Sequence, residues 1–353
     1  MKEEDLLFTP ISEKINIEQV REHSKLAPET LAKKQARDRE LEAILKGEDD
    51  RLLLVIGPCS SDNEEAVLDY AHRLAKLQEE VKDKIFMVMR VYTAKPRTNG
   101  DGYKGLMHQP DTDAAPSLIN GIKAVRNLHY RVITETGLTT ADEMLYPDNL
   151  QYLSDIMSYI AVGARSVENQ YHRLVASGCD VPVGMKNPTS GDLSVMLNSV
   201  HAAQHGHEFI YRSWEVKTEG NPLTHCILRG AVNKHDQCLP NYHYEDLIRL
   251  WDMYEKMDLK NPACVIDANH SNSNKQFKEQ IRITKEVMHS RKLSPDLHKL
   301  VKGVMIESYI EEGNQKVGAG CYGKSITDKC LSWNTTEQLL RELAHAVAAR
   351  RWK

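Results

Sequence analysis

The sequence lacks several features, and each absence narrows the class of protein. No apolar run approaches the roughly 18 residues of a membrane-spanning helix, and the acidic start has neither region of a signal peptide. Positive charge is not in excess, since 46 Lys and Arg face 50 Asp and Glu and give a net charge of −4. We therefore expect a soluble, cytoplasmic protein with neither a membrane nor a nucleic acid as partner.

Paired cysteine motifs are also missing. The chain has 7 cysteines, an odd number without CxxC spacing, which fits reduced thiols better than a disulfide framework. Any one of them could be a metal ligand or part of the core.

The length leaves the domain organisation open, because 353 residues could form two domains or one α/β barrel with additions. Residues 1–50 are polar and contain one helical pattern, over 28–45, that ends at Gly47. We interpret them as an arm outside a catalytic unit of residues 51–353. The narrow apolar stripe of the arm needs a partner surface, either on its own subunit or on a neighbour.

From residue 52 onwards, short apolar runs alternate with longer amphipathic segments, the pattern of a (β/α)8 TIM barrel. The eight expected strands are 52–56, 85–89, 131–134, 160–162, 181–185, 208–211, 264–266 and 301–306. Residues 213–227 are expected to form an inserted β-hairpin after the sixth strand. A closing helix is expected over 337–349, capped by Thr335 or Thr336.

The most informative stretch follows the second strand. Arg90, Lys95 and Arg97 lie within eight positions, and Pro96 disfavours helix at the residue before it. Converging cations at a strand end suit a strongly anionic ligand, such as a phosphate or a carboxylate. The alternative is a solvated basic loop.

Residues after the other strands would join this stretch, because the active site of a barrel lies where its strands end. The cations at this rim suit two phosphorylated ligands and a carboxylate, or else they pair with barrel carboxylates. They are Arg90, Lys95, Arg97, Lys104, Arg165, Lys186 and Arg229. Cys59, His270 and Glu307, with Asp328 as a further candidate, mix soft and hard ligands and suit a divalent transition ion. Taken alone, Cys59 would more often be a buried apolar residue.

Residues 318–325 match the phosphate-binding pattern G-x-x-x-x-G-K-S. A true P-loop follows a strand directly and precedes most of a parallel sheet. This match lies about ten residues beyond the last expected strand, and 28 residues remain after Ser325. We therefore expect a turn at the rim rather than a nucleotide site.

Several motifs together resemble the type I 3-deoxy-D-arabino-heptulosonate 7-phosphate (DAHP) synthases, specifically the microbial group with feedback-regulated members. The resemblance runs from about residue 28 to the C-terminus. It is carried by Gly57-Pro58-Cys59-Ser60, Lys95-Pro96-Arg97-Thr98, Gly163-Ala164-Arg165, Lys186-Asn187, Arg229-Gly230, His270, Glu307-Ser308 and Gly323-Lys324-Ser325-Ile326-Thr327-Asp328.

The resemblance implies a metal-dependent condensation of phosphoenolpyruvate with erythrose 4-phosphate that yields DAHP and phosphate, the first step of the shikimate pathway. By similarity, the metal ligands would be Cys59, His270, Glu307 and Asp328, and the ion would be Mn²⁺, Fe²⁺, Co²⁺ or Zn²⁺. The phosphoenolpyruvate site would comprise Arg90, Lys95, Glu143, Arg165, Lys186 and Arg229. The aldose site would comprise Lys95, Pro96, Arg97, Thr98 and Asp328. Lys95 is the expected proton donor to the new alkoxide.

Regulated members of this group bind an aromatic amino acid at positions that map onto residues 144–153 and 174–181. The candidate effector residues are Tyr146, Leu150, Gln151, Cys179 and Asp180. Tyr146, Leu150 and Asp180 stand where regulated relatives tend to have an acid, a proline and a small polar residue. The effector is expected to be phenylalanine or tyrosine. Because of these three departures, either the effector differs from that of the regulated relatives, or sensitivity to it is weak or absent. The retained arm favours a homotetramer or a homodimer.

Two rival interpretations remain. A sister synthase joins phosphoenolpyruvate to arabinose 5-phosphate on a similar barrel, but residues 95–98 and the long arm favour the four-carbon aldose. A catalytically inactive barrel could instead serve as a regulatory partner, although every expected catalytic residue is present.

Overall fold

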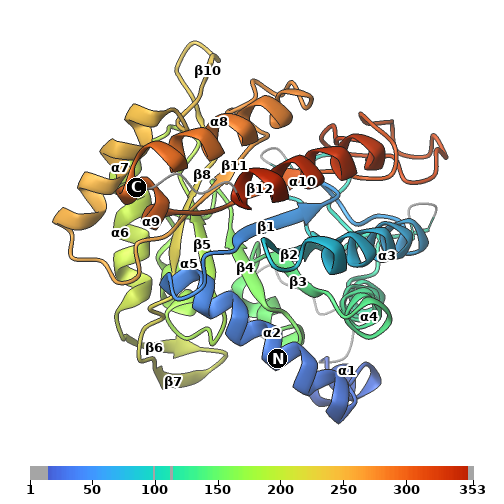
Figure 1. Cartoon of the computed structure of the whole chain (residues 1–353). Helices are drawn as coiled ribbons and strands as arrows, with labels where there is room; N and C mark the ends of the chain where they lie inside the picture. The colour runs from blue at the N-terminus through green and yellow to red at the C-terminus, as the bar shows by residue number, and fades with distance from the viewer. Residues whose placement is uncertain (1–14, 98–99, 112–113, 349–353) are drawn as a thin grey trace.

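Eight parallel strands close into a barrel in the computed structural model, which describes residues 15–97, 100–111 and 114–348 (Figure 1). Around the barrel the order is β1, β12, β11, β8, β5, β4, β3 and β2. These strands are β1 (Leu52–Gly57), β2 (Ile85–Arg90), β3 (Thr139–Glu143), β4 (Tyr159–Val162), β5 (Val183–Lys186), β8 (His225–Leu228), β11 (Cys264–Asp267) and β12 (Val301–Glu307). The TIM barrel expected from the sequence is confirmed.

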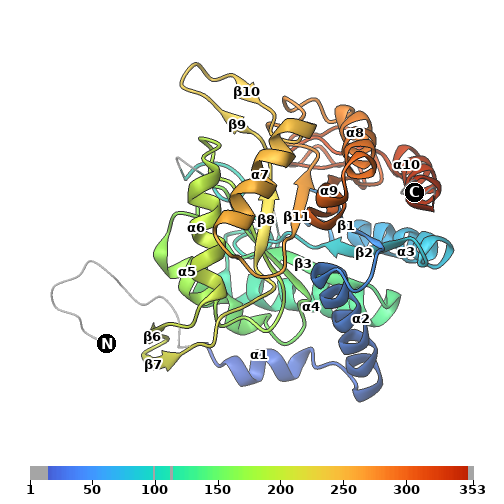
Figure 2. The same ribbon diagram turned by 60° about the vertical axis from the view of Figure 1, so that its left-hand side comes forward.

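Helices surround the barrel and bury one face each against it (Figures 1 and 2). They are α3 (Glu64–Val81), α4 (Leu118–Thr136), α5 (Gln170–Ala176), α6 (Leu193–Gln204), α7 (Tyr244–Lys256), α8 (Glu279–Leu293), α9 (Pro295–Leu300) and α10 (Trp333–Ala348). A short 3₁₀ helix, η1 (Pro147–Tyr152), follows β3. Asn63 caps the first outer helix, α3, by accepting a hydrogen bond from the Ala66 backbone N–H.

Close packing between β1 and β12 closes the sheet. Leu53 pairs with Gly303, and a Cβ added at Gly303 would fall 2.0 Å from the Leu53 carbonyl oxygen. Only glycine fits at that position.

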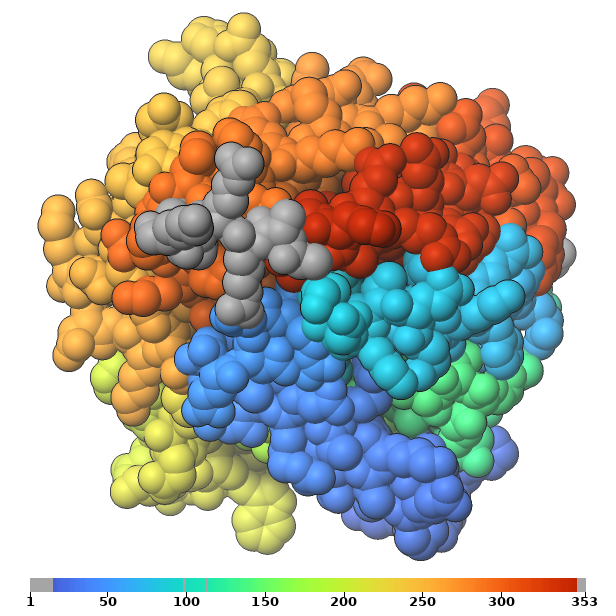
Figure 3. Space-filling model, in the orientation of Figure 1, coloured from blue at the N-terminus to red at the C-terminus, as the bar shows by residue number. Residues whose placement is uncertain are grey.

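The N-terminal arm consists of α1 (Ile17–His23) and α2 (Pro28–Lys46), which ends at Gly47 as expected. Leu41, Ile44 and Leu45 of α2 are fully buried and pack with the interior of the barrel, including Leu53 and Phe86. In the space-filling view the arm continues the surface of the barrel beside α3 (Figure 3). The partner surface of α2 therefore belongs to its own subunit.

Arg126 joins α1 to the barrel from the middle of α4. Its buried guanidinium donates hydrogen bonds to both carboxylate oxygens of Asp155 and to the backbone carbonyls of Tyr152, Arg21 and Ser24. Because these acceptors come from two separate segments, one side chain fixes the arm against the η1 region.

Two of the expected strands are wrong. Residues 131–134 lie in α4, where Val132 and Ile133 continue the helical stripe of Val125 and Leu128, and the true third strand is β3. Its sequence, Thr-Thr-Ala-Asp-Glu, carries almost no apolar signal although its first four residues are buried.

Residues 208–211 are likewise not a barrel strand. They form β6 (Glu208–Tyr211), which pairs antiparallel with β7 (Trp214–Lys217), so this inserted hairpin precedes the sixth barrel strand, β8. A second small hairpin, β9 (Ala231–Val232) with β10 (Cys238–Leu239), follows β8. Both segments around 210 and 226 have strand-like composition, and only pairing in space distinguishes them.

The closing helix α10 starts at Trp333, four residues before the expected start. Ser332 supplies the capping oxygen, since its hydroxyl accepts from the Thr335 backbone N–H at 3.3 Å. None of the helices within the described ranges is long and apolar enough to cross a membrane.

Candidate active site

A cavity of about 370 Å³ opens where the barrel strands end. Most of the predicted site residues line it, although they come from distant parts of the chain. These are Cys59, Arg90, Lys95, Pro96, Arg97, Glu143, Arg165, Lys186, Arg229, His270, Glu307 and Asp328. The parallel strands thus bring both predicted groups, the cations and the metal ligands, into one space.

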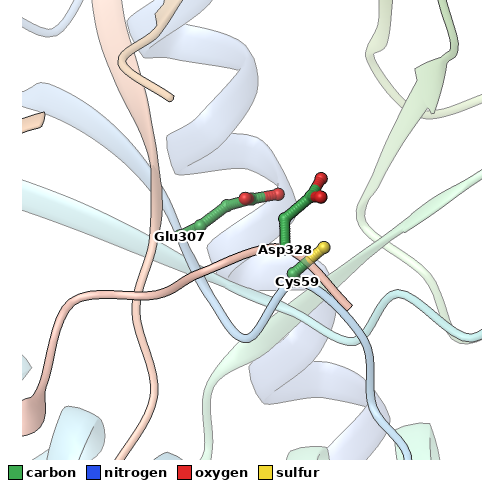
Figure 4. A group of neighbouring side chains, drawn as sticks. All are labelled: Cys59, Glu307 and Asp328. Atoms are coloured by element: carbon green, nitrogen blue, oxygen red, sulfur yellow. The ribbon is translucent and has the colours of Figure 1, made fainter. Parts of the chain in front are cut away.

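Three of the four predicted metal ligands converge. Ligand atoms of Cys59, Glu307 and Asp328 all lie within 4.8 Å of one another, and Figure 4 shows the side chains extending toward the same space. His270 lies beside them, with Nε2 3.8 Å from an Asp328 carboxylate oxygen and 4.0 Å from a Glu307 oxygen. A thiol, an imidazole and two carboxylates together form a donor set for a divalent transition ion.

The buried members of this set are oriented by the protein. Gln280 holds the backbone of Glu307 with two hydrogen bonds, to its N–H and its carbonyl. The Glu307 carboxylate accepts from Arg90 at 3.0 Å and from the Asn269 amide at 2.6 Å. Each oxygen therefore has a fixed direction before any ligand binds.

Lys95 lies against Cys59. Its ammonium donates to the Cys59 carbonyl and lies 3.5 Å from Sγ. Burial raises the pKa of the Cys59 thiol to about 11, and the Glu307 carboxylate adds to this. Burial alone would lower the pKa of Lys95, but the nearby Cys59 and Glu307 raise it above the ordinary value. The lysine is thus a protonated donor.

Arg90 is the most enclosed cation of the cavity. Its side chain is 1% exposed, its guanidinium lies 3.9 Å from the centre of the Tyr92 ring, and it forms an ion pair with Glu307. Although burial opposes it, Tyr92 and Glu307 raise the pKa of Arg90. Within the described ranges, Nη1 of Arg90 and Nη1 of Arg229 are buried without a hydrogen-bond partner. Such donors suit an anionic ligand.

Glu143 brings a carboxylate to the same wall. A Cβ added at Gly163 would fall 2.4 Å from the Glu143 Oε1 atom, so the glycine of the Gly163-Ala164-Arg165 motif leaves room for this side chain. The glycine is therefore required because a side chain would clash with Glu143, and not because the backbone turns there.

Two predicted substrate residues are not among those that line the cavity. Lys104 is exposed on the loop after β2, where its carbonyl accepts from the Lys95 backbone N–H at 3.0 Å. Thr98 lies outside the described residues. Arg97 is held in the same loop, because its Nε donates to the Tyr103 carbonyl at 2.8 Å.

Sequence reasoning missed other residues of the cavity wall. Tyr92, Thr189, Lys275 and Thr327 line it, as do Val232 and Asp236 of the β9–β10 hairpin. Tyr92 lies within the motif of cations, and its distance of two residues from Arg90 could have indicated its position. Nothing in the sequence indicates that residues of this hairpin reach the cavity.

The residues expected to bind an effector divide between two hollows. Leu150, Gln151, Cys179 and Asp180 line a cavity of about 580 Å³ on the outside of the barrel, together with the β6–β7 hairpin and Arg21 of the arm. Tyr146 instead lines a small neighbouring hollow and lies beside His108.

The P-loop-like segment at 318–325 forms a loop after β12. The Gln315 side chain bridges it by donating to the carbonyls of Cys321 and Lys324, and the motif's serine is buried. It neither directly follows a strand nor begins a helix, as expected.

Comparisons with known proteins agree with this geometry. The family model described as "DAHP synthetase I family" matches residues 21–341. The chain is 43% identical over 322 residues to the Phe-sensitive phospho-2-dehydro-3-deoxyheptonate aldolase of Escherichia coli K12, covering 89% of this chain and 88% of that protein. It is 40% identical over 309 residues to the Tyr-sensitive aldolase of Salmonella typhimurium, covering 85% and 83%.

A solved structure is similar over almost the whole chain. The phospho-2-dehydro-3-deoxyheptonate aldolase of Francisella tularensis SCHU S4 superposes with a TM-score of 0.89 at 33% identity, covering 98% of this chain and all of that one. With the cavity, its cations and its ligand cluster, these similarities show that the chain belongs to the DAHP synthetase I family, the DAHP synthases that begin the shikimate pathway of aromatic amino-acid biosynthesis.

Proposed function

We propose that the rim cavity condenses phosphoenolpyruvate with erythrose 4-phosphate, with a divalent transition ion held by Cys59, His270, Glu307 and Asp328. The observation that carries this proposal is the juxtaposition of two groups in one cavity. Thiol and carboxylate ligand atoms lie within 4.8 Å of one another, and buried arginine and lysine side chains surround them. A metal cluster beside an anion site suits a reaction between two phosphorylated substrates.

The donor set fits Mn²⁺, Fe²⁺, Co²⁺ or Zn²⁺ better than Mg²⁺ or Ca²⁺, because it includes sulfur and nitrogen. When bound, the ion acts as a Lewis acid that polarises the aldehyde of the aldose. Cys59 must lose its proton to serve as a ligand, and its high pKa makes metal binding favour alkaline pH. A metal ion competes with that proton.

The cations hold phosphoenolpyruvate and favour its reaction. Arg90, Lys186, Arg165 and Arg229 would bind its carboxylate and phosphate, which orients C3 toward the aldehyde carbon. As the C–C bond forms, water adds to C2 and loses one proton to solvent. Phosphate then leaves with cleavage of the C–O bond and takes up the remaining hydroxyl proton, so that C2 becomes a ketone. Lys95 donates its proton to the oxygen of the former aldehyde. Pro96, Arg97, Thr98 and Asp328 would bind the rest of the aldose.

The test is phosphate release from phosphoenolpyruvate with either erythrose 4-phosphate or arabinose 5-phosphate, with and without a chelator. We expect turnover with erythrose 4-phosphate only, loss of that turnover after chelation, and recovery when Mn²⁺, Fe²⁺, Co²⁺ or Zn²⁺ is added. Preference for arabinose 5-phosphate would favour the sister synthase, and no turnover with either would favour an inactive barrel. Activity that survives chelation would contradict the metal assignment.

We also propose feedback regulation through the outer cavity, on the basis of its volume of about 580 Å³ and its lining from four separate parts of the chain. An aromatic amino acid would pack against Leu150 and Val175, and Arg21 and Asp180 would offer opposite charges to its carboxylate and ammonium groups. Arg21 also donates to the Gln151 carbonyl at 2.6 Å, so occupation of the cavity would act on the arm and on η1 together.

Phenylalanine, tyrosine and tryptophan are to be titrated separately into the activity assay. We expect phenylalanine or tyrosine to inhibit, and Cys179→Phe, which fills the cavity, to remove the inhibition while leaving uninhibited turnover intact. If none of the three amino acids changes the rate, the feedback proposal is wrong.

The same region supports association between subunits. Ile210 and Trp214 of the β6–β7 hairpin are apolar side chains that are 65% and 74% exposed. Exposed apolar side chains that lie close together are typical of protein–protein contact surfaces. We propose that this hairpin and the arm form the interface of a homotetramer or a homodimer. Light scattering in solution distinguishes the two masses.

A further inference from the structure

Asp267, at the end of β11, lies between the metal ligands and the phosphate-binding cations. Its side chain is 1% exposed, and one of its oxygens, Oδ2, is shared by two partners. Nδ1 of His270 lies 2.8 Å from this oxygen, and the Lys186 ammonium lies 3.3 Å from it. The other oxygen accepts from the Asn269 backbone N–H at 3.0 Å.

The backbone of His270 has an unusual conformation. Its φ of 45° lies in the left-handed region, which residues other than glycine adopt only where the surroundings fix them. The Lys275 N–H donates to the His270 carbonyl, and the Asn272 amide donates to the Asp267 carbonyl, both at 2.9 Å. The backbone is thus held by the turn, and the imidazole ring is held by Asp267.

The orientation of the ring decides which nitrogen faces the other metal ligands. In a neutral imidazole, a hydrogen bond from Nδ1–H to the carboxylate selects the tautomer whose Nε2 carries no proton, and Nε2 is the atom that points toward Glu307 and Asp328. On the opposite side, the same oxygen fixes Lys186, whose ammonium projects into the cavity with the arginines.

We infer that Asp267 is a positioning residue that links metal binding to phosphoenolpyruvate binding, by orienting His270 and Lys186 through a single carboxylate oxygen. The inference rests on the proposed function, since it assumes that His270 binds the metal and that Lys186 binds phosphoenolpyruvate. It adds a residue that touches neither ligand and acts on both.

Asn in place of Asp267 keeps the shape but cannot serve all three donors. If its oxygen faces Asn269, its NH₂ group meets His270 and Lys186, which are donors as well. If its oxygen faces His270 and Lys186, the buried Asn269 N–H loses its acceptor, and the negative charge that held Lys186 is gone. Either way, His270 is no longer restricted to the tautomer that presents Nε2.

The experiment measures binding rather than turnover, in the full-length protein. Affinity for Mn²⁺ or Zn²⁺ is determined by competition with a chromophoric chelator, and affinity for phosphoenolpyruvate by calorimetry on the metal-loaded protein. We expect Asp267→Asn to weaken metal binding by about 10- to 100-fold, as changes to the partner of a ligating histidine typically do. We also expect Asp267→Asn to weaken phosphoenolpyruvate binding. This loss should be smaller when the substitution is made in the Lys186→Met variant than when it is made in the wild type.

Asp142→Asn is the matched control. Asp142 is 3% exposed, lies at the end of β3 and also contacts a histidine, with Oδ2 3.4 Å from His129 Nε2, but it is not part of the ligand cluster. We expect this variant to lose stability and to retain wild-type metal affinity. Equal losses of metal affinity in both variants would show a general structural effect and overturn the inference.

The outcomes separate this inference from the function on which it rests. If the wild-type protein binds neither Mn²⁺ nor Zn²⁺, the proposed metal site is wrong. If the wild type binds metal and Asp267→Asn binds it equally well, only the role of Asp267 is wrong. If Asp267→Asn fails to fold, the metal affinity of Asp267→Glu is measured instead. Glutamate keeps the negative charge but displaces the carboxylate oxygen that His270 and Lys186 share. Wild-type metal affinity in Asp267→Glu would then refute the inference.

Discussion

Lys95→Met is expected to lower kcat by about 10²- to 10⁴-fold, the contribution typical of a positioned general acid, while phosphoenolpyruvate still binds. Lys95 is protonated, contacts the carbonyl and the sulfur of Cys59, and lies in the loop that carries Arg97. It is therefore placed between the metal cluster and the aldose side of the cavity. Methionine retains the length and apolar stem of lysine and removes only the proton donor and its charge.

The measurement is steady-state turnover with both substrates saturating, combined with direct binding of phosphoenolpyruvate to the metal-loaded variant. Lys123→Met is the control, because Lys123 is an exposed lysine on the outer face of α4. Its turnover should equal that of the wild type. Undiminished kcat in Lys95→Met would refute the role as proton donor, and loss of phosphoenolpyruvate binding would assign Lys95 to binding instead.

The barrel could be predicted because most of its strands are short, fully buried apolar runs. The exception is instructive. β3 is buried although it reads Thr-Thr-Ala-Asp-Glu, because Thr140 accepts or donates to His129 at 2.8 Å and Asp142 is satisfied by Thr93 and His129. A strand whose polar groups are paired inside the protein gives no hydrophobic signal. The pairing partners lie on other elements, which local sequence does not indicate.

The residues of the site could be predicted from the sequence, but the hydrogen bonds and ion pairs between them could not. Cys59 and His270 each follow a strand and Glu307 ends one, so the barrel itself predicts their meeting. Asp267 also ends a strand, but nothing in its spacing indicates that one of its oxygens serves both His270 and Lys186. The contribution of the β9–β10 hairpin was missed for a similar reason, since the Val232 backbone N–H donates a hydrogen bond to the carbonyl of Thr189, a distant residue that also lines the cavity.

The buried ion pair between Arg90 and Glu307 is expected to contribute strongly to stability. Both side chains are 1% exposed and their charged atoms are 3.0 Å apart. In metal-free protein, prepared with a chelator, the substitution Arg90→Met should lower the free energy of unfolding by about 3–5 kcal/mol, because the buried Glu307 carboxylate is then left without its counter-ion. Added Mn²⁺ or Zn²⁺ should return part of this loss, because a bound cation compensates the same Glu307 charge. Urea denaturation with and without the ion measures both effects.

Glu307→Gln is the matched variant, since it removes the other partner of the same pair. It leaves Arg90 buried and unpaired, and it also removes a proposed metal ligand, so the ion should not restore the lost stability. Combining both substitutions should destabilise the protein by less than the sum of the single changes, because neither charge is then left alone. If the ion stabilises Arg90→Met and Glu307→Gln equally, Glu307 is not a ligand. If it stabilises only Arg90→Met, the single carboxylate group of Glu307 connects the stability of the barrel, the binding of metal and the anion site.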